Sequence, residues 1–371
     1  MQFAFTEEQD QLRGFVRQFL EEKSSEATVR ELMATDDGYD EAVWQQMAEQ
    51  MGLQSLIIPE QYGGQGFTWV EMVVVLEEMG RALLCAPFFS TAILATSTLL
   101  LSGDEAAASE YLPKIASGEL VATLAMTEEN GRWDESGITA EATPDGDGWK
   151  ISGAKHYVLD GHIAGLVIVA ARTAAGVSLF AVDSGADGMT ATPLATMDQT
   201  RKQAQVKFVN TPAKLIGEDG AGWTTLTAVL DRASVALAAE QVGGAQMVLD
   251  MAVEYAKVRH QFGRPIGSFQ AIKHKCADML LEVEAAKSAA YYSAWCAAED
   301  NDELPAMASL AKSYCSEAYF HAAAENIQIH GGIGFTWEHP AHLYFKRAKS
   351  SELLFGDPTY HRELLASRIG L

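Results

Sequence analysis

Hydrophobic and polar positions follow three successive patterns along the chain. Up to about residue 120, apolar residues recur at helical spacing, as they do between Leu12 and Leu20. From about residue 121 they gather in short β-branched runs separated by Gly, Asp and Pro, and beyond residue 222 the helical spacing returns in Ala- and Leu-rich stretches. The pattern predicts an α+β protein with an N-terminal α-helical domain (1–120), a middle antiparallel β domain (121–222) and a C-terminal four-helix bundle (223–371).

Local signals place individual elements within these domains. Thr6 and Gln9 fit a capping box, so a helix is expected to begin after Thr6. A Gly-rich loop over 59–66 separates two of the expected helices. The expected helices include 41–51, 69–81, 224–258, 268–300 and 305–330, and the expected strands include 149–151, 166–169, 177–182 and 206–209.

Composition and charge narrow the classes of function. The chain has 371 residues, 48% of them hydrophobic, which is enough for two or three packed domains. Its 27 Lys and Arg against 50 Asp and Glu give a net charge of −23, which repels nucleic acids and anionic membranes, so a phosphate-bearing ligand needs a local basic region. The four cysteines form no C-x-x-C pair, and the sequence shows neither a secretion signal nor a membrane span. We therefore expect a cytoplasmic protein in a reducing compartment.

Most catalytic signatures are absent from the sequence. It contains no G-x-S-x-G elbow, no P-loop, no H-E-x-x-H pair and no G-x-G-x-x-G between a strand and a helix. The histidines lack the spacing of a metal site, so we expect packed or solvated roles for them and no bound metal. Metal-dependent hydrolysis and Rossmann dinucleotide binding are therefore disfavoured.

One segment is strongly basic in this acidic chain. Between residues 255 and 277 there are five cations and no acid. A glycine and a proline interrupt the helical pattern there, so Arg259, Phe262 and Gln270 are expected to converge on one turn. A cation, an aromatic face and an amide suit a pyrophosphate beside an adenine ring. An ordinary helix-turn-helix with a solvated basic face would have the same residues.

Two further segments carry candidate binding residues. Gln328 precedes a run of glycines that begins with Gly331 and Gly332, which permit positive φ and the close approach of a ligand, although a helix C-cap and a turn would use the same residues. In the β region, Thr127 is placed either to hydrogen-bond a planar heterocycle or to form a turn. Tyr157 is placed either to present an aromatic face or to pack in the core.

Taken in order, these motifs resemble those of the acyl-CoA dehydrogenase family over nearly the whole chain. The resemblance rests on Phe5–Gln9, on Pro59–Gly64, on Arg259-x-x-Phe-Gly with Gln270, and on Gln328-Ile-x-Gly-Gly-x-Gly-Phe. It implies FAD as the cofactor, an acyl-CoA thioester as the substrate, and α,β-dehydrogenation as the reaction. In that chemistry a carboxylate removes the α proton while the β hydrogen leaves as hydride to the flavin.

In the family, FAD lies between two subunits, so the resemblance divides the site into two halves. The half that retains a neighbour's FAD is complete in this sequence. Its matching residues are Arg259, Phe262, Gln270, Gln328, Gly331 and Gly332. The half that serves a subunit's own active site retains Thr127, as a flavin contact, and Asp231, as an acid near the CoA path.

The rest of the own-site half departs from the family pattern. The catalytic-base position falls on Phe355, which has no proton acceptor, and the base position of another branch falls on Ala233. Leu159 replaces the threonine that meets the flavin. Trp133 and Ser234 replace a serine and an arginine of the family's substrate path.

The sequence therefore favours a subunit that clamps FAD for a partner. We predict an α2β2 assembly with a homologous acyl-CoA dehydrogenase subunit, an acyl-CoA substrate, and an electron-transfer flavoprotein or similar acceptor. The resemblance extends to the heterotetrameric bacterial branch that acts on sterol or bile-acid side chains. Three alternatives stay open: a self-sufficient homotetramer with Glu352 or Asp357 as an unusual base, a member with changed chemistry that resembles desulfinases, and a non-catalytic oligomer without flavin.

Overall fold

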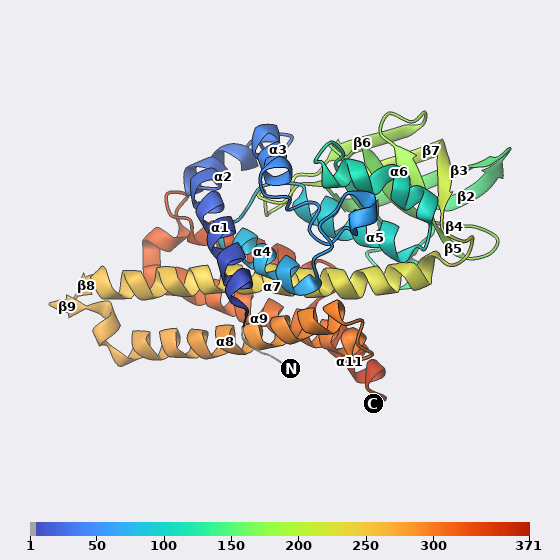
Figure 1. Ribbon diagram of the computed structural model, residues 1–371. Helices are drawn as coiled ribbons and strands as arrows, with labels where there is room; N and C mark the ends of the chain where they lie inside the picture. The colour runs from blue at the N-terminus through green and yellow to red at the C-terminus, as the bar shows by residue number, and fades with distance from the viewer. Residues whose placement is uncertain (1–4) are drawn as a thin grey trace. The chain divides into compact units, whose positions relative to one another are not determined.

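Helix α7 (Gly222–Val258) is shared by the two units into which the chain divides (Figure 1). The computed structural model describes residues 5–371, so residues 1–4, which contributed to the expectation of no secretion signal, lie outside the described residues. The first unit contains the chain up to Arg30, 69–84 and 234–371, and the second contains 31–68 and 85–233. Among the described residues, no helix is both long and apolar enough to cross a lipid bilayer.

The first unit is helical. Besides the larger part of α7, it contains α1 (Glu7–Lys23), most of α2 (Glu26–Met33), α4 (Trp69–Arg81), α8 (Gln270–Ala298), α9 (Leu304–His330), α10 (Ala341–Leu353) and α11 (Pro358–Arg368). The capping box predicted at Thr6 and Gln9 is confirmed, because each side chain bonds the other residue's backbone N–H.

Small residues let the helices of the first unit approach closely. Where α4 crosses α7, a Cβ atom on Gly80 would lie 2.0 Å from the carbonyl oxygen of Glu240. A Cβ atom on Gly243 would lie 1.8 Å from the carbonyl oxygen of Glu77. The core that α7, α8 and α9 share is mostly alanine: Ala238, Val242, Ala286, Ala290, Ala311, Cys315 and Ala318. The Ala-rich sequence is thus explained by close helix packing.

The second unit combines short helices with a seven-stranded sheet. The helices are α3 (Glu41–Glu49), α5 (Thr96–Leu101) and α6 (Glu105–Ala116), with a π-helical segment at Phe89–Ala95. The strands are β1 (Ala122–Ala125), β2 (Glu141–Asp145), β3 (Gly148–Leu159), β4 (Leu166–Arg172), β5 (Val177–Asp183), β6 (Met189–Pro193) and β7 (Gln203–Ile216). Their order is β1-β4-β2-β3-β7-β5, and because β5 also pairs with β4, five strands close into a ring around an apolar core.

The predicted antiparallel pairing holds for most of this sheet, and the exceptions are two parallel pairings with β4. Strand β1 runs parallel to β4, with Ala122 opposite Leu166, and β2 meets β4 in parallel at a single position. The first of these arises because β1 follows helix α6 and joins the sheet beside a strand distant in sequence, which local patterning does not reveal. The three successive regions of helix, sheet and helix are nevertheless as predicted.

Candidate active site

The predicted break between two helices is a β-hairpin. Between α7 and α8, β8 (His260–Gln261) pairs with β9 (Arg264–Pro265). The two residues between them, Phe262 and Gly263, have φ values of +52° and +77°, which is the conformation of a type I′ turn. Glycine adopts such φ values freely, whereas phenylalanine is strained by them. At the tip of this turn Phe262 is 91% exposed.

Aromatic contacts stiffen the base of the hairpin. The Phe262 ring packs edge-on against Phe269 at a centroid distance of 6.1 Å, and the Arg264 guanidinium lies 4.1 Å from the Phe269 centroid. The backbone N–H of Ile266 donates to the carbonyl oxygen of Arg259 at 2.7 Å. Helix α8 then begins at Gln270 without a side-chain cap, so its first N–H groups are available to an anion.

The basic segment is less basic in three dimensions than in sequence. Lys257 pairs with Glu254 at 2.6 Å, and Lys275 pairs with Glu325 of α9. Lys257 also lines the groove between α7 and α8, together with Lys273. Arg259, in contrast, is exposed and has no ion-pair partner among the described residues. Two of the five cations counted in the sequence are therefore neutralised, one by an acid of the preceding helical turn and one by an acid of α9.

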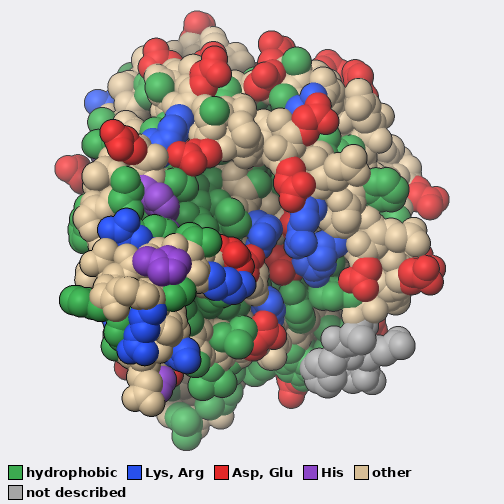
Figure 2. Space-filling view, turned by 90° about the vertical axis from the view of Figure 1, so that its left-hand side faces the viewer, with side chains coloured by type: hydrophobic (Ala, Val, Ile, Leu, Met, Phe, Trp, Pro, Cys, Tyr) green, Lys and Arg blue, Asp and Glu red, His purple; other side chains and the backbone are tan. Residues whose placement is uncertain are grey.

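The glycine turn at the end of α9 lies against the last turn of α7. The rings of Tyr255 and His330 stack at a centroid distance of 4.2 Å with an interplanar angle of 27°. Gly331 has φ of +64°, and a Cβ atom on either Gly331 or Gly332 would meet nothing within 4 Å. The structure therefore brings the two predicted clamp segments to one end of the first unit. Figure 2 looks onto the face where β8 and β9 lie, and there Lys and Arg side chains gather among hydrophobic and histidine side chains.

These exposed residues fit an anionic dinucleotide. Arg259 offers an unpaired guanidinium for phosphate, Phe262 an open ring face, and Gln270 an amide on an uncapped helix N-terminus. Gln328 is exposed as well, and the backbone at Gly331 is open to close approach. We refer to this set as the clamp: Arg259, Phe262, Gln270, Gln328, Gly331 and Gly332.

The position aligned with the family's base is apolar and buried. Phe355 is 6% exposed and has φ of +62°. The buried ammonium of Lys312 donates at 3.0 Å to the carbonyl oxygens of Glu352 and Gly356, on either side of Phe355. Burial, and next the charge of Lys312, lower the pKa of His361 to about 3, and its neutral ring lies 3.1 Å from the Phe355 carbonyl oxygen. The turn is held rigidly, yet its side chain cannot accept a proton.

The two residues considered as unusual bases have structural partners. One oxygen of the Glu352 carboxylate accepts from Lys349 at 2.9 Å. Asp357 caps α11 by accepting from the backbone N–H of Tyr360 at 2.8 Å, and it is exposed. Ala233, the other aligned base position, is fully buried and has no acceptor.

Thr127 and Asp231 both lie in the second unit, where each is buried. The Thr127 carbonyl accepts from the backbone N–H of His156 at 2.8 Å, which fixes the end of β1 against β3. The residues next to Thr127 and His156 form an ion pair that the sequence analysis missed. The fully buried Lys155 donates to Glu128 at 2.6 Å. Its sequence signal is an acid that directly follows Thr127 and a lysine within a later expected strand segment.

The Lys155–Glu128 pair is enclosed by further hydrogen bonds. Glu128 accepts backbone N–H groups of Thr139 and Ala140 at 2.9 Å, and Lys155 also donates to the Met126 carbonyl at 3.2 Å. Burial lowers the pKa of Lys155 to about 8, against the opposing pull of Glu128. Burial alone would raise the pKa of Glu128, but the Lys155 charge and these donors lower it overall.

A bulge in β3 changes the direction in which the chain presents Tyr157. The register passes from Lys155 opposite Val206 to Val158 opposite Ala204, so β3 carries one extra residue there. Tyr157 has φ of +56° and is 54% exposed, so it presents an aromatic face and does not pack in the core. Leu159, at the position of the flavin-facing threonine, is buried and offers no side-chain hydrogen bond.

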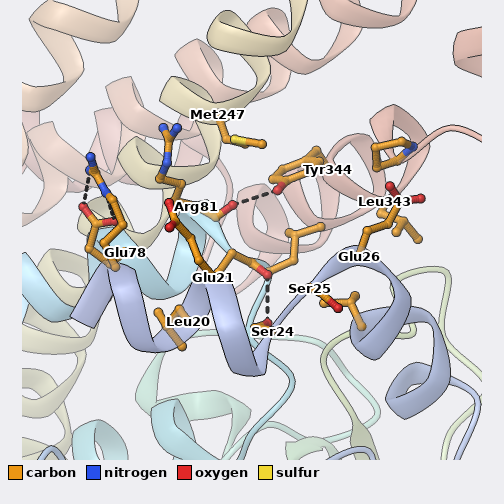
Figure 3. A pocket seen from close by; sticks show the side chains of 15 residues that line it. Leu20, Glu21, Ser24, Ser25, Glu26, Glu78, Arg81, Met247, Leu343 and Tyr344 are labelled. Atoms are coloured by element: carbon orange, nitrogen blue, oxygen red, sulfur yellow. Dashed lines mark hydrogen bonds and ion pairs between the residues drawn. The ribbon is translucent and has the colours of Figure 1, made fainter. Parts of the chain in front are cut away.

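The first unit also holds a cavity of about 250 Å³ that no sequence motif indicated (Figure 3). Two hydrogen bonds brace its wall, from Ser24 to the Ala82 carbonyl at 3.0 Å and from Tyr344 to the Arg81 carbonyl at 2.7 Å. Glu26 of α2 and Pro340, just before α10, lie on the same cavity. None of the predicted site residues lines it.

Comparison with known proteins decides the family. Models of the N-terminal, middle and C-terminal domains of acyl-CoA dehydrogenases match residues 6–119, 123–211 and 220–370. The chain belongs to the acyl-CoA dehydrogenase family. It is therefore related to flavoprotein oxidoreductases that act on acyl-CoA thioesters.

Several acyl-CoA dehydrogenases are similar over their full length. One is acyl-CoA dehydrogenase IpdE2 of Mycobacterium tuberculosis, 37% identical over 359 residues, which cover 97% of this chain and 95% of that protein. A chain of the Tcur3481-Tcur3483 steroid ACAD is 31% identical with a TM-score of 0.88, and covers 98% of each chain. A chain of the ChsE4-ChsE5 complex from Mycobacterium tuberculosis is 28% identical with a TM-score of 0.91, and covers 100% of this chain and 99% of that one.

Proposed function

We propose that this chain is a subunit of an FAD-dependent acyl-CoA dehydrogenase that holds the FAD of a homologous partner subunit through its clamp. The partner supplies the catalytic base and the flavin-facing residues. FAD, when bound, accepts the hydride removed from the β carbon of the substrate. The clamp of this chain binds and orients the cofactor, and its own base position contributes no proton transfer.

The observation that carries the proposal is the side chain at the base position. α-Proton abstraction needs an acceptor within hydrogen-bond reach of the substrate, and Phe355 offers none. The turn around Phe355 is fixed by Lys312 on both sides, so the aligned position has a defined backbone and an inert side chain. The clamp, in contrast, keeps every residue of the family pattern and leaves Arg259 unpaired among the described residues.

The substrate proposed is the acyl-CoA thioester of a steroid or bile-acid side chain. It is supported by the neighbours whose names include a steroid ACAD and a two-component complex. Asp231, assigned to a CoA path, and Thr127, assigned to a flavin edge, belong to this chain's own half of the site, which lacks a base in the proposed assembly. An electron-transfer flavoprotein or similar acceptor completes the proposed cycle.

One observation favours the alternative that this chain is a self-sufficient enzyme. The second carboxylate oxygen of Glu352 is buried and has no hydrogen-bond partner among the described residues. Glu352 lies one helical turn before Phe355, so it is the first candidate for a base if this chain acts alone.

The first prediction separates these two functions. The chain purified alone is expected to show no acyl-CoA-dependent reduction of an artificial acceptor, because it lacks a base. Co-purified with the product of an adjacent reading frame, it should show turnover and one flavin for every two chains, measured by flavin absorbance. Turnover by the isolated chain that Glu352→Gln abolishes, or one flavin for each copy of this chain, would contradict the proposal.

The second prediction concerns the clamp. Arg259→Ala is expected to weaken FAD binding by the assembly about tenfold to a hundredfold, because a charge-assisted hydrogen bond contributes roughly 1.5–3 kcal/mol. Fluorescence titration of the FAD-free assembly at constant salt measures this. The matched control is Arg362→Ala, an exposed arginine paired with Glu317 at 2.6 Å, which should leave the affinity unchanged. Equal affinities for the two variants would show that Arg259 is only a solvated cation.

A further inference from the structure

Three aromatic rings in contact, called the stack below, join the two segments of the clamp. The His330 ring stacks on Tyr255, one helical turn before Arg259, and its centroid lies 4.3 Å from that of the tilted His339 ring, at an angle of 47°. Nδ1 of His330 lies 2.9 Å from the Asn326 carbonyl oxygen, so this nitrogen carries the proton in the neutral ring. His330 is buried and directly precedes Gly331. The position of the glycine turn relative to α7 therefore depends on this ring.

The charged groups that act on these rings come from two elements. From α2, Glu26 and Arg30 act on both His339 and His342, and they bond each other at 2.9 Å. From α10, Lys346 acts on His342, which contacts Trp337 at a centroid distance of 4.7 Å. From α7 and α9, the stack meets the uncharged Tyr255 ring and the Asn326 carbonyl. The carboxylate of Glu26 is thus already paired with an arginine.

We propose that His330 is a positioning residue of the clamp: its neutral ring, in contact with Tyr255 and His339, fixes the glycine turn against the end of α7, and protonation of the two imidazoles releases that turn. This inference rests on the proposed function only in assigning FAD to the clamp. The stack itself and its response to acid are properties of the first unit.

The direction of the pH dependence follows from burial. Burial, and for His339 also the nearby His330, lower the pKa of both rings below their usual 6.5. Below pH 6.5 the unfolded or released state therefore binds more protons than the stacked state, and stability falls as the pH falls. Two imidazolium rings at 4.3 Å would also repel each other. The stacked clamp is therefore expected to be fully stable above pH 6.5 and progressively destabilised as the pH falls below it.

The experiment compares three proteins as the co-purified assembly at pH 7.5 and 5.5. FAD affinity of the wild type is expected to fall about tenfold across this range, since two protonations are coupled to release. His330→Ala should bind FAD weakly at both pH values. His330→Phe, which retains a stacking ring but cannot be protonated, should recover most of the affinity lost in His330→Ala and show a much smaller change with pH. A wild-type profile in His330→Phe, or no loss in His330→Ala, would overturn the inference.

A measurement without cofactor separates this inference from the proposed function. Hydrogen exchange of residues 331–339, corrected for the intrinsic effect of pH, should show increased opening at pH 5.5 in the wild-type chain and little change in His330→Phe. If Arg259→Ala leaves FAD affinity unchanged but this opening is observed, the stack responds to acid as inferred and the assignment of FAD to the clamp is wrong. If Arg259→Ala weakens FAD binding but exchange does not change with pH, the inferred response of the stack to acid is wrong.

Discussion

Gly243→Ala is expected to leave no stably folded protein. The added Cβ atom would lie 1.8 Å from the Glu77 carbonyl oxygen and 2.9 Å from the Arg81 backbone nitrogen. Both atoms belong to the α4 backbone, so no side-chain rotation relieves the overlap, and the two helices must separate. Overpacking of a core costs about 1–3 kcal/mol and occasionally more. We expect a loss above this range, a large part of the roughly 5–15 kcal/mol that keeps a domain folded.

Gly14→Ala is the matched control. Gly14 lies in the middle of α1, and a Cβ atom there would meet nothing within 4 Å. Alanine in an exposed helix interior is more favourable than glycine by roughly 0.5–1 kcal/mol, so this variant should be slightly more stable than the wild type. Expression yield and urea unfolding followed by circular dichroism compare the two. A Gly243→Ala protein with an unfolding midpoint equal to that of the wild type would refute the close helix crossing.

Glu128→Leu is expected to cost about 3–5 kcal/mol, because it leaves the Lys155 ammonium buried with only the Met126 carbonyl. The double variant Glu128→Leu with Lys155→Met removes both charges and should recover part of this loss. Urea unfolding of the two variants and the wild type measures the difference.

The same variants have a distinctive pH dependence. The pKa of Lys155 is about 8 with Glu128 present, and without that carboxylate it must fall further. Between this lowered pKa and the usual lysine pKa of 10.5, the folded Glu128→Leu protein binds fewer protons than its unfolded chain. Its free energy of unfolding should therefore rise from pH 7 to pH 9 relative to that of the double variant. Parallel stability of the two variants over this range would contradict a buried, charged Lys155.

The parts of the fold that depend on neighbouring residues could be predicted from the sequence. The capping residues and periodicity placed three long helices over 224–258, 268–300 and 305–330, within two residues of α7, α8 and α9. The order of helical and sheet regions followed from the change in the spacing of apolar residues near residues 121 and 222. Of the site, the segments of the clamp were predictable because each is a turn with its own glycine signal. Their roles in binding FAD stay predictions.

What the sequence could not supply depends on contacts between distant segments. The parallel pairing of β1 and the Lys155–Glu128 pair both join residues that only the sheet topology brings together. The pairing of Lys275 was not foreseen for the same reason, since Glu325 of α9 is 50 residues away in the sequence. Histidines at 330 and 339 were expected to be packed or solvated, but their mutual stacking requires the chain after α9 to turn back.

The type I′ turn at Phe262 lowers the stability of the unbound chain in order to place a residue of the proposed clamp. Asparagine or glycine would adopt its φ of +52° at lower cost, so the unbound chain would be more stable with either residue there. The sequence instead carries an aromatic ring that is strained in its backbone and almost fully hydrated. A laboratory selection for heat resistance of the isolated chain would therefore replace Phe262 early, and under the proposed function the selected proteins would hold FAD less tightly.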